Sequence, residues 1–341
     1  MLTERDPAPP PGTRVVVRYA LPTPDPQSGA RLTDVIGMLV ESTEERIVVD
    51  ADAGRVRIPR SAVVATRIIP PRPARRGAPH RALSIEDLER VMIEAWPPVE
   101  RAHLGDWVLR FGNGFTQRAN SALVLGHPDR PVASALQAVR SWYAVRALPP
   151  RLSIPWATGG AMADDDIVRA ALRTGWSATA PVLVMTADVR TVLASTQEAA
   201  GGIAGLPARS IDVTDRMSDE WFGVLCESRP SSRGGVEAVL HGSPLQRFAV
   251  ARGSDGGAVG IARVGVAAGW AGLGAMWVHP GHRRQGGGRA LLHAAARQAT
   301  AHGCVSMHLQ VESTNASALA LYESAGFTTH HRYAYLTAAG A

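Results

Sequence analysis

Hydrophobic and polar positions follow two different rhythms along this chain. Up to about residue 70, short runs rich in β-branched residues alternate with polar positions and are separated by turn residues, a pattern typical of β-strands. From residue 84 onward, strand-like runs alternate with longer segments in which apolar residues recur every three or four positions, as on one face of a helix. The pattern therefore predicts a small all-β domain followed by a larger part that mixes helices and strands.

The all-β segment is short, and its five strands lie close together. We expect a small barrel of SH3-like type over residues 13–70, preceded by a proline-rich, disordered tail at 1–12 and followed by a proline- and arginine-rich linker at 71–83. A role in binding nucleic acid or peptides is open, but a docking or oligomerisation role is favoured, because no aromatic cluster is available for bases to stack on. The predicted strands are 13–19, 34–41, 46–50, 55–58 and 64–69.

The larger part divides at a stretch of small residues, 195–208, which we interpret as a second linker. The segment before it, 84–194, starts with a helix capped by Ser84 and ending at Pro97. Its other predicted elements are strands 105–111 and 118–125, helix 132–146, strand 152–156, helix 164–173 and strand 181–186. In the last segment, 209–341, we expect helices after Ser218 and over 234–241, then strands 247–252, 258–266 and 272–278, a glycine loop with a helix, strand 306–311, helix 316–324 and strand 332–336.

The two segments of the larger part resemble each other. Residues 171–176 match residues 322–327, and both segments are followed by a predicted strand. In the same way, the tripeptide Gly126-His127-Pro128 matches Val278-His279-Pro280. The first copy has no glycine loop, and Ala171 stands where the second copy has Tyr322. We therefore expect two similar folds, of which only the second binds the ligand of the glycine loop.

The glycine loop lies between a predicted strand and a predicted helix. Gly286, Gly287 and Gly288 precede an Ala/Leu-rich segment, so unpaired backbone N–H groups and the positive end of the helix dipole favour an anion there. No Lys-Ser/Thr pair follows, and the spacing is not G-x-G-x-x-G, which excludes two common nucleotide loops.

This loop resembles the coenzyme A pyrophosphate loop, R/Q-x-x-G-x-G/A, of the GNAT N-acetyltransferase superfamily, with Arg283, Gly286 and Gly288 in the pattern. A second motif runs from Asn315 through Tyr322 to Gly326-Phe327 and is similar to the family signature N-x-x-A-x-x-x-Y-x-x-x-G-F. The resemblance covers about residues 209–338. It implies a mixed α/β (α+β) sheet fold, acetyl-CoA as co-substrate without a metal, and transfer of acetyl to a primary amine by direct attack.

The resemblance also implies roles for individual residues. The strand that ends at Met276, Trp277 and Val278 is expected to splay from its neighbour and offer backbone groups to the thioester and the pantetheine arm. Asn315 is expected to bond that arm, and Tyr322 to protonate the leaving thiolate as general acid. The residues expected to hold the pyrophosphate are Arg283, Arg284, Gln285, Gly286, Gly287, Gly288 and Arg289.

The general base departs from the family pattern, because no acidic residue lies on the strand before the loop. Glu312, at the end of the next strand, is the candidate that we carry forward. Glu237 and a chain of water molecules are alternatives, and for each glutamate a solvated surface carboxylate is the favoured interpretation. His279 and His282 are expected to belong to the loop.

The acceptor amine is less determined than the donor. The order of a small barrel and two GNAT-like segments resembles an actinobacterial acetyltransferase family described as N-acetylglutamate synthases of the arginine pathway and, more loosely, as histone-type acetyltransferases. That resemblance implies L-glutamate, for whose carboxylates Arg118, Asn120 and Arg229 are candidate ligands. A protein or peptide acetyltransferase, and a non-catalytic acetyl-CoA sensor or nucleic-acid-binding protein, are the alternatives.

Composition narrows the class of protein further. The net charge of +6 is carried by arginine in a chain without lysine, which suits anionic ligands such as coenzyme A. Because GC-rich coding explains arginine without lysine better than nucleic-acid binding does, we do not expect nucleic acid as a partner. Two distant cysteines imply neither a disulfide framework nor a metal cluster. No apolar run has the length of a membrane span, and no signal peptide is recognisable, so we expect a cytoplasmic protein of undetermined oligomeric state.

Overall fold

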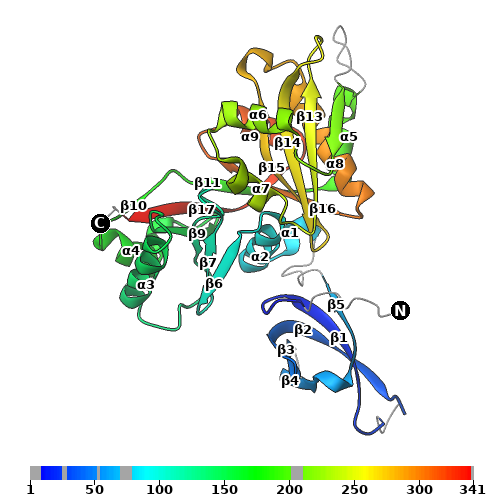
Figure 1. Ribbon diagram of the computed structural model, residues 1–341, viewed down its shortest axis with the longest axis vertical. Coiled ribbons are helices and arrows are strands. Elements are labelled where there is room, and N and C mark those ends of the chain that lie inside the picture. The colour runs from blue at the N-terminus through cyan, green and yellow to red at the C-terminus, as the bar shows by residue number, and fades with distance from the viewer. Residues whose placement is uncertain (1–8, 25–28, 52–53, 70–78, 201–209, 339–341) are drawn as a thin grey trace. The chain divides into compact units, whose positions relative to one another are not determined.

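The computed structural model describes residues 9–24, 29–51, 54–69, 79–200 and 210–338. The chain forms two compact units, Met1–Pro71 and Arg72–Ala341 (Figure 1). The expected tail at 1–12 and linker at 71–83 lie largely outside the described residues.

The smaller unit contains the five strands that the sequence predicts, and they form an antiparallel sheet in the order β4-β3-β2-β1-β5. Alternation along β1 directs Val15 and Val17 inward, where they meet Leu39 and Ile58 in one core. A register shift between Leu39 and Glu41 bends β2, as a β-bulge does. The strands are β1 (Arg14–Ala20), β2 (Leu32–Ser42), β3 (Arg46–Ala51), β4 (Gly54–Pro59) and β5 (Val63–Ile68), with a 3-10 turn η1 (Arg60–Ala62).

The larger unit contains one mixed sheet that runs through both copies, in the order β12-β13-β14-β15-β16-β11-β17-β9-β8-β7-β6, with β10 beside β17. Two pairs are parallel, β8 with β9 and β15 with β16, and in each case a helix joins the two strands. The two copies therefore share this unit, as the internal repeat predicts. The strands are β6 (Glu100–Leu104), β7 (Trp107–Phe111), β8 (Ala122–Leu123), β9 (Arg151–Ala157), β10 (Trp176–Ala178), β11 (Val182–Asp188), β12 (Ile211–Thr214), β13 (Leu245–Arg252), β14 (Ala258–Ala267), β15 (Trp270–Val278), β16 (Ser306–Glu312) and β17 (Thr328–Ala338).

The two copies exchange their last strands. β11, from the first copy, lies between β16 and β17 of the second, with Val182 opposite both Glu312 and Tyr333. In return, β17 extends into the first copy and lies between β9 and β10, with Leu336 opposite Leu152 and Ala178. Each copy therefore completes the sheet of the other.

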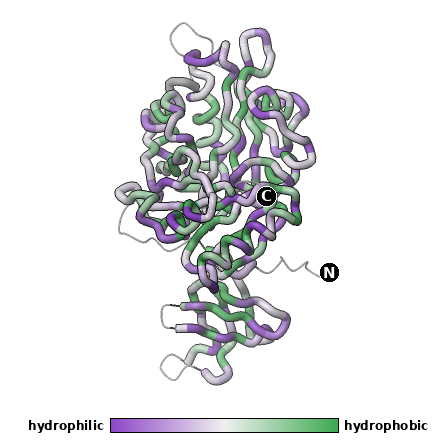
Figure 2. The backbone as a smooth tube through the Cα atoms, turned by 90° about the vertical axis from the view of Figure 1, so that its left-hand side faces the viewer, coloured by the Kyte–Doolittle hydropathy of each residue, from purple (hydrophilic) through white to green (hydrophobic). Residues whose placement is uncertain are grey.

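Helices cover both faces of the sheet (Figure 1). In the second copy, α5, α8 and α9 share a core with one face, while α6 and α7 pack on the other. Hydrophobic residues follow the strands inside these layers, and polar residues gather in the loops (Figure 2). The helices are α1 (Pro79–Ala82), α2 (Ile85–Ala95), α3 (Val132–Ala144), α4 (Asp166–Arg173), α5 (Val189–Ala200), α6 (Asp219–Ser228), α7 (Arg233–Leu240), α8 (Gly287–Ala301) and α9 (Ala316–Ser324), with 3-10 turns η2 (Met162–Asp164) and η3 (Pro280–His282).

A fully buried arginine holds α2 and α7 against β14. Nη1 of Arg263 donates to the carbonyl oxygen of Ala95 at 2.6 Å, and Nε and Nη2 donate to that of Leu240 at 3.1 and 2.9 Å. Both carbonyls lie at helix C-termini, where a cation is favourable. Burial lowers the pKa of Arg263 to about 9, and the charge of Arg118 acts in the same direction. The guanidinium thus fixes the end of α2 and the tryptophan that follows it.

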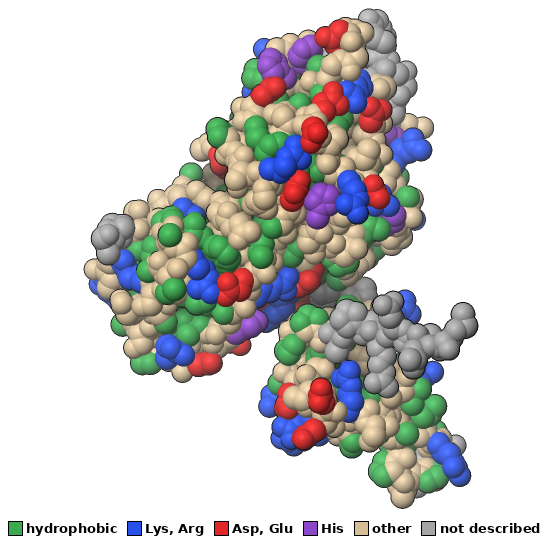
Figure 3. Space-filling model, viewed as in Figure 1, with side chains coloured by type: hydrophobic (Ala, Val, Ile, Leu, Met, Phe, Trp, Pro, Cys, Tyr) green, Lys and Arg blue, Asp and Glu red, His purple; other side chains and the backbone are tan. Residues whose placement is uncertain are grey.

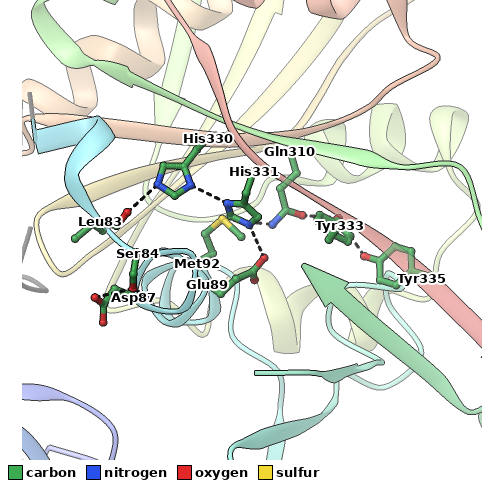
Figure 4. Close-up of polar contacts among 10 residues, drawn as sticks. All are labelled: Leu83, Ser84, Asp87, Glu89, Met92, Gln310, His330, His331, Tyr333 and Tyr335. Carbon is green, nitrogen blue, oxygen red and sulfur yellow. Dashed lines mark hydrogen bonds and ion pairs between the residues drawn. The ribbon is translucent and has the colours of Figure 1, made fainter. Parts of the chain in front are cut away.

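A second buried contact joins α2 to β17 (Figure 4). Nε2 of His331 lies 3.0 Å from Oε1 of Glu89, and Nδ1 of His331 lies 2.9 Å from Nδ1 of His330, whose Nε2 lies 3.0 Å from the carbonyl oxygen of Leu83. Because a carbonyl only accepts, Nε2 of His330 carries the hydrogen and its Nδ1 accepts from His331. The histidine pair and Glu89 thus link α2 to β17 through buried polar contacts.

Several elements differ from those that the sequence predicts. The predicted strand 118–125 is reduced to β8, because residues 112–121 form a compact loop with positive φ at Asn113 and Thr116. The strand expected over 105–111 is present as β7, and an additional strand that was not predicted, β6, precedes it and pairs with it in a hairpin. β17 is longer than the predicted 332–336. The linker expected at 195–208 begins inside α5, and most of it lies outside the described residues.

The surface is mixed in charge. On the face of the larger unit shown in Figure 3, arginine and carboxylate side chains are interspersed rather than gathered by sign. No helix among the described residues is long and apolar enough to cross a bilayer.

Gly265 is the sharpest steric test of how α2 packs on β14. A Cβ atom at this position would overlap the carbonyl oxygen of Ala95 and the guanidinium of Arg263. We expect Gly265→Ala to lower the free energy of unfolding by about 1–3 kcal/mol, measured by denaturant titration. Gly234→Ala is the matched control, since a Cβ atom there meets nothing within 4 Å and alanine favours helix. Equal stability of the two variants would contradict this packing.

The burial of His308 leads to a prediction of how the stability of the fold depends on pH. Burial lowers its pKa to about 3, assisted by the charges of Arg118, Arg263 and His331. Between pH 6.5 and 3 the unfolded chain binds a proton that the folded chain does not, so stability is highest above pH 6.5 and falls as the pH decreases. We expect His308→Leu to flatten the fall of the melting temperature between pH 7 and 4. His127→Leu, at an exposed histidine, is the control. If the melting temperature of His308→Leu falls as steeply with pH as that of this control, the buried His308 is not the cause.

Candidate functional site

A cavity of about 770 Å³ opens in the larger unit where the two copies meet. The first copy lines it with the 112–121 loop and the start of β9, and the second copy lines it with β15, β16, α9 and β17. Trp96, just after α2, also lies on its wall, where its indole nitrogen donates to Oγ1 of Thr116 at 3.3 Å. The strand exchange thus produces a single cavity from segments that are far apart in the sequence.

β15 leaves its neighbour at the cavity. It pairs with β16 only from Trp270 to Leu273, and after this point it is paired with β14 alone. Ala275 has a φ of 48°, and the register with β14 shifts opposite it, so the strand bulges where it lines the cavity. Gly274 is needed there, because a Cβ atom would lie 2.5 Å from Cζ3 of Trp96. The splay that the sequence predicts at Met276 is present.

The glycine loop is a tight turn into α8. Gly286 is the N-cap, with a φ of 81° that favours glycine, and it follows Arg284 at 57°. α8 then has fifteen residues, so its first N–H groups form the positive end of a full-length helix. A Cβ atom on Gly288 would lie 3.2 Å from Cδ2 of Leu321 and 3.4 Å from Cε of Met276, which shows how closely this turn approaches β15 and α9.

The arginines of the loop differ in their contacts. Nε of Arg283 donates to the carbonyl oxygen of Val278 at 3.1 Å, which braces the loop on the end of β15. Both terminal nitrogens of the Arg289 guanidinium donate hydrogen bonds: Nη1 to the carbonyl oxygen of Ser195 at 2.6 Å, and Nη2 to Oγ of Ser324 at 2.9 Å. Gln285 donates to the carbonyl oxygen of Gly281 at 3.3 Å. The side chain of Arg289 therefore has a structural task beside the ligand role that we predicted for it.

Tyr322 lies under the splayed strand. Its ring is buried in α9, and its hydroxyl donates to the sulfur of Met276 at 3.7 Å. Burial raises the pKa of Tyr322 to about 12. The hydroxyl is therefore protonated throughout the neutral range and directed at the cavity edge of β15, as a hydrogen-bond donor to a ligand there has to be.

Glu312 and Asn315 lie on the cavity wall between β16 and α9. Oδ1 of Asn315 accepts from the backbone nitrogen of Ala318 at 3.2 Å, so this side chain caps α9. Glu312 is exposed at the end of β16 and is the one carboxylate among the described residues that line the cavity. The alternative base Glu237 pairs with Arg233 at 3.3 Å and is not part of this lining.

The three residues predicted for the acceptor all line the cavity, but in different ways. Asn120 is buried and holds the 112–121 loop: it accepts from the backbone nitrogens of Gly112 and Gly114 and donates to the carbonyl oxygens of Phe115 and Thr116. Its four bonds organise the loop. Arg229 is exposed after α6, whereas Arg118 lies with its guanidinium 4.9 Å from the Trp96 ring.

Sequence reasoning missed several polar residues of the cavity: Thr116, Gln117, Arg151, Ser228, Gln310, Tyr333 and Tyr335. The hydroxyl of Tyr333 donates to Oε1 of Gln310 at 2.8 Å and lies 3.3 Å from that of Tyr335 (Figure 4). Arg151 faces the Tyr335 ring at 6.0 Å. Tyr333 and Tyr335 have the strand period of two, which signals a shared face but not a cavity, and nothing around Arg151 in the sequence distinguishes it.

This arrangement fits the coenzyme that the glycine loop predicts. The splayed strand and the buried Tyr322 line the cavity. The glycine loop is not among the described lining residues, but Gly288 closely approaches Met276 of β15 and Leu321 of α9. The N–H groups at the start of α8 suit a diphosphate, and the splay leaves a strand edge for an extended amide-containing arm.

Comparisons with known proteins agree with this geometry. A family model described as "Probable histone acetyltransferase Rv0428c C-terminal" matches residues 83–336, and one described as "Rv0428c N-terminal Sm-like domain" matches residues 9–67. The small antiparallel β domain is thus Sm-like, which confirms the expected fold class.

Whole proteins give the same result. The probable histone acetyltransferase Rv0428c of Mycobacterium tuberculosis is 30% identical over 331 residues, which cover 96% of this chain and 95% of that protein. A GCN5-related N-acetyltransferase from Kribbella flavida has a similar fold, with a TM-score of 0.55 at 15% identity, covering 76% of this chain and 98% of that one. A tandem GNAT protein from the clavulanic acid biosynthesis pathway also has a similar fold, with a TM-score of 0.51 at 18% identity, covering 77% of this chain and 90% of that one. The chain therefore belongs to the Rv0428c family, and it is a GNAT-type N-acetyltransferase with an N-terminal Sm-like domain.

Proposed function

We propose that this enzyme transfers the acetyl group of acetyl-CoA to a primary amine on a protein or peptide. The observation that carries the transfer is the buried Tyr322, directed at the splayed end of β15 on the wall of a cavity that both copies line. The choice of a protein acceptor is supported by the name of the mycobacterial relative, a probable histone acetyltransferase.

Binding is assigned to the splayed strand and the helix that follows it. Backbone groups of Met276, Trp277 and Val278 hold the pantetheine arm and the thioester carbonyl, beside Asn315. The residues from Arg283 to Gly288 hold the diphosphate through the N-terminal end of α8, with the backbone of Arg289. Acetyl-CoA supplies an activated thioester, and the donors on β15 favour the charge that develops on its oxygen during attack.

Tyr322 acts as the acid in this proposal. With a pKa of about 12, its hydroxyl keeps its proton at neutral pH and can donate it to the leaving sulfur. The hydroxyl already donates a hydrogen bond to a sulfur atom, that of Met276.

Glu312 acts as the base, directly or through water. It is the one carboxylate among the described lining residues, and it lies at the end of β16, the strand from which β15 separates. A carboxylate placed there can remove the proton that an ammonium must lose before its nitrogen attacks.

L-Glutamate is the second candidate acceptor. The specific observation in its favour is that Arg118, Arg151 and Arg229 line the cavity, since a dicarboxylate needs cationic partners. Neither the family descriptions nor the relatives named above mention glutamate or arginine biosynthesis, so the protein or peptide amine is placed first.

A turnover screen distinguishes these acceptors. The full chain is given acetyl-CoA with lysine peptides, peptides with free N-termini, L-glutamate and simple amines, and release of the coenzyme A thiol is recorded. Thiol release with a peptide supports the proposal. Release with L-glutamate alone selects the second candidate, and no amine-dependent release would refute acetyl transfer at this site.

Removing the proposed acid tests the mechanism. We expect Tyr322→Phe to lower kcat about a hundredfold while the Kd of coenzyme A, measured by calorimetry, changes little, because the lost hydroxyl serves the departing sulfur. Tyr19→Phe, in the smaller unit, is the matched control and should keep full activity. An unchanged kcat for Tyr322→Phe under conditions where chemistry limits the rate would exclude this role.

Removing the proposed base has a different signature. We expect Glu312→Gln to lower kcat/KM at neutral pH and to recover activity as the pH rises, because at high pH the amine loses its proton to solvent without help. The pH profile of kcat/KM is the measurement. A parallel loss at every pH would indicate that Glu312 binds rather than deprotonates the acceptor.

A further inference from the structure

The cavity has an uneven charge. Among the described residues that line it, three are arginines, Arg118, Arg151 and Arg229, and one is a carboxylate, Glu312. Arg118 and Arg151 come from the first copy, which has no glycine loop, and Glu312 comes from the second. The first copy therefore contributes two of the three arginines to the described lining and no carboxylate, while Arg229 comes from the second copy.

Arg118 is held in place without an anion. Its loop is fixed by the four hydrogen bonds of Asn120, and its guanidinium lies over Trp96, whose ring is also 5.3 Å from the guanidinium carbon of Arg263. Its Nε is buried and has no hydrogen-bond partner, and no ion pair joins Arg118 to a carboxylate among the described residues. A buried N–H donor without an acceptor lowers the stability of the fold, and a ligand that accepts its hydrogen bond would remove this cost.

Arg151 lies beside Tyr335 on the wall of the same cavity. It is half-buried on β9, where Nε donates to Oγ1 of Thr337 at 3.3 Å and the guanidinium faces Tyr335. Burial raises the pKa of Tyr333 well above its usual value, and the charge of Arg118 works against that rise, so Arg118 lies within electrostatic reach of Tyr333. Both arginines line the same cavity as the hydroxyls of Tyr333 and Tyr335, which are 3.3 Å apart.

We propose that Arg118 and Arg151 form an anion subsite that recognises a carboxylate on the acceptor, close to the amine that is acetylated. The inference rests on the proposed acetyl transfer and adds the substrate class. The planar guanidinium groups match a carboxylate in shape and charge. A lysine flanked by other basic residues would bring like charge to this wall. An acidic residue next to the acetylated amine, or the carboxylate of a free amino acid, supplies the same chemistry.

The experiment compares matched acceptors. Two peptides differ only in one residue next to the acceptor lysine, Glu in one and Gln in the other, and L-glutamate is compared with L-glutamine. The full chain should show about a tenfold higher kcat/KM for the acidic member, mainly through KM. Arg118→Gln and Arg151→Gln should each remove most of this preference, measured as the ratio of kcat/KM for the acidic acceptor to kcat/KM for the neutral one. Arg118→Lys should keep part of it.

Arg173→Gln, an exposed arginine on α4, is the control and should keep the full preference. If the wild type acetylates acidic and neutral acceptors equally, or if the preference survives in both glutamine variants, the subsite is overturned while the proposed transfer stands. If no amine is acetylated, the proposed transfer fails first. A preference seen with L-glutamate alone, and lost in the variants, supports the subsite and assigns it to a free amino acid.

Discussion

The hydrogen bonding of β17 is the constraint on which the larger unit depends. This one strand pairs with β11 along its first half and with β9 and β10 along its second, while β11 fills the gap beside β16. Neither copy has a complete sheet without a strand from the other. Because backbone donors and acceptors in a sheet have to be paired, the copies cannot separate without breaking both ladders. The cavity lies at this join, so its shape is as fixed as the sheet itself.

Arg263 carries that constraint to the cavity wall. A buried arginine with carbonyl partners at the ends of α2 and α7 holds two helices from different copies on one strand. The end of α2 places Trp96 on Gly274, beside the bulge where β15 leaves β16. The contact between Glu89 and His331 fastens the same helix to β17. The wall is thus fixed by polar groups that are buried in matched sets, as groups removed from water have to be.

The two copies share a fold but contribute different chemical groups to the cavity. The second copy has the glycine turn and Tyr322, while the first keeps the strand–helix–strand order with its parallel pair and has lost the loop. What the first copy adds is a wall, made by the 112–121 loop and Arg151. A repeat without a ligand motif is still needed in this arrangement, because the cavity is incomplete without it.

The sequence by itself determined the local features of this protein: the strands of the small domain, the left-handed glycine before α8, and the spacing that puts Asn315 at the cap of α9 and Tyr322 two turns later. Turns, caps and helix faces depend on neighbours in the chain, so a pattern can predict them. Only the tertiary structure decided the strand exchange, the structural use of Asn120 and the presence of Arg151 and Tyr333 in the cavity. A buried strand has the same apolar pattern whichever neighbour it pairs with, and a polar side chain is committed by partners that lie far away in sequence.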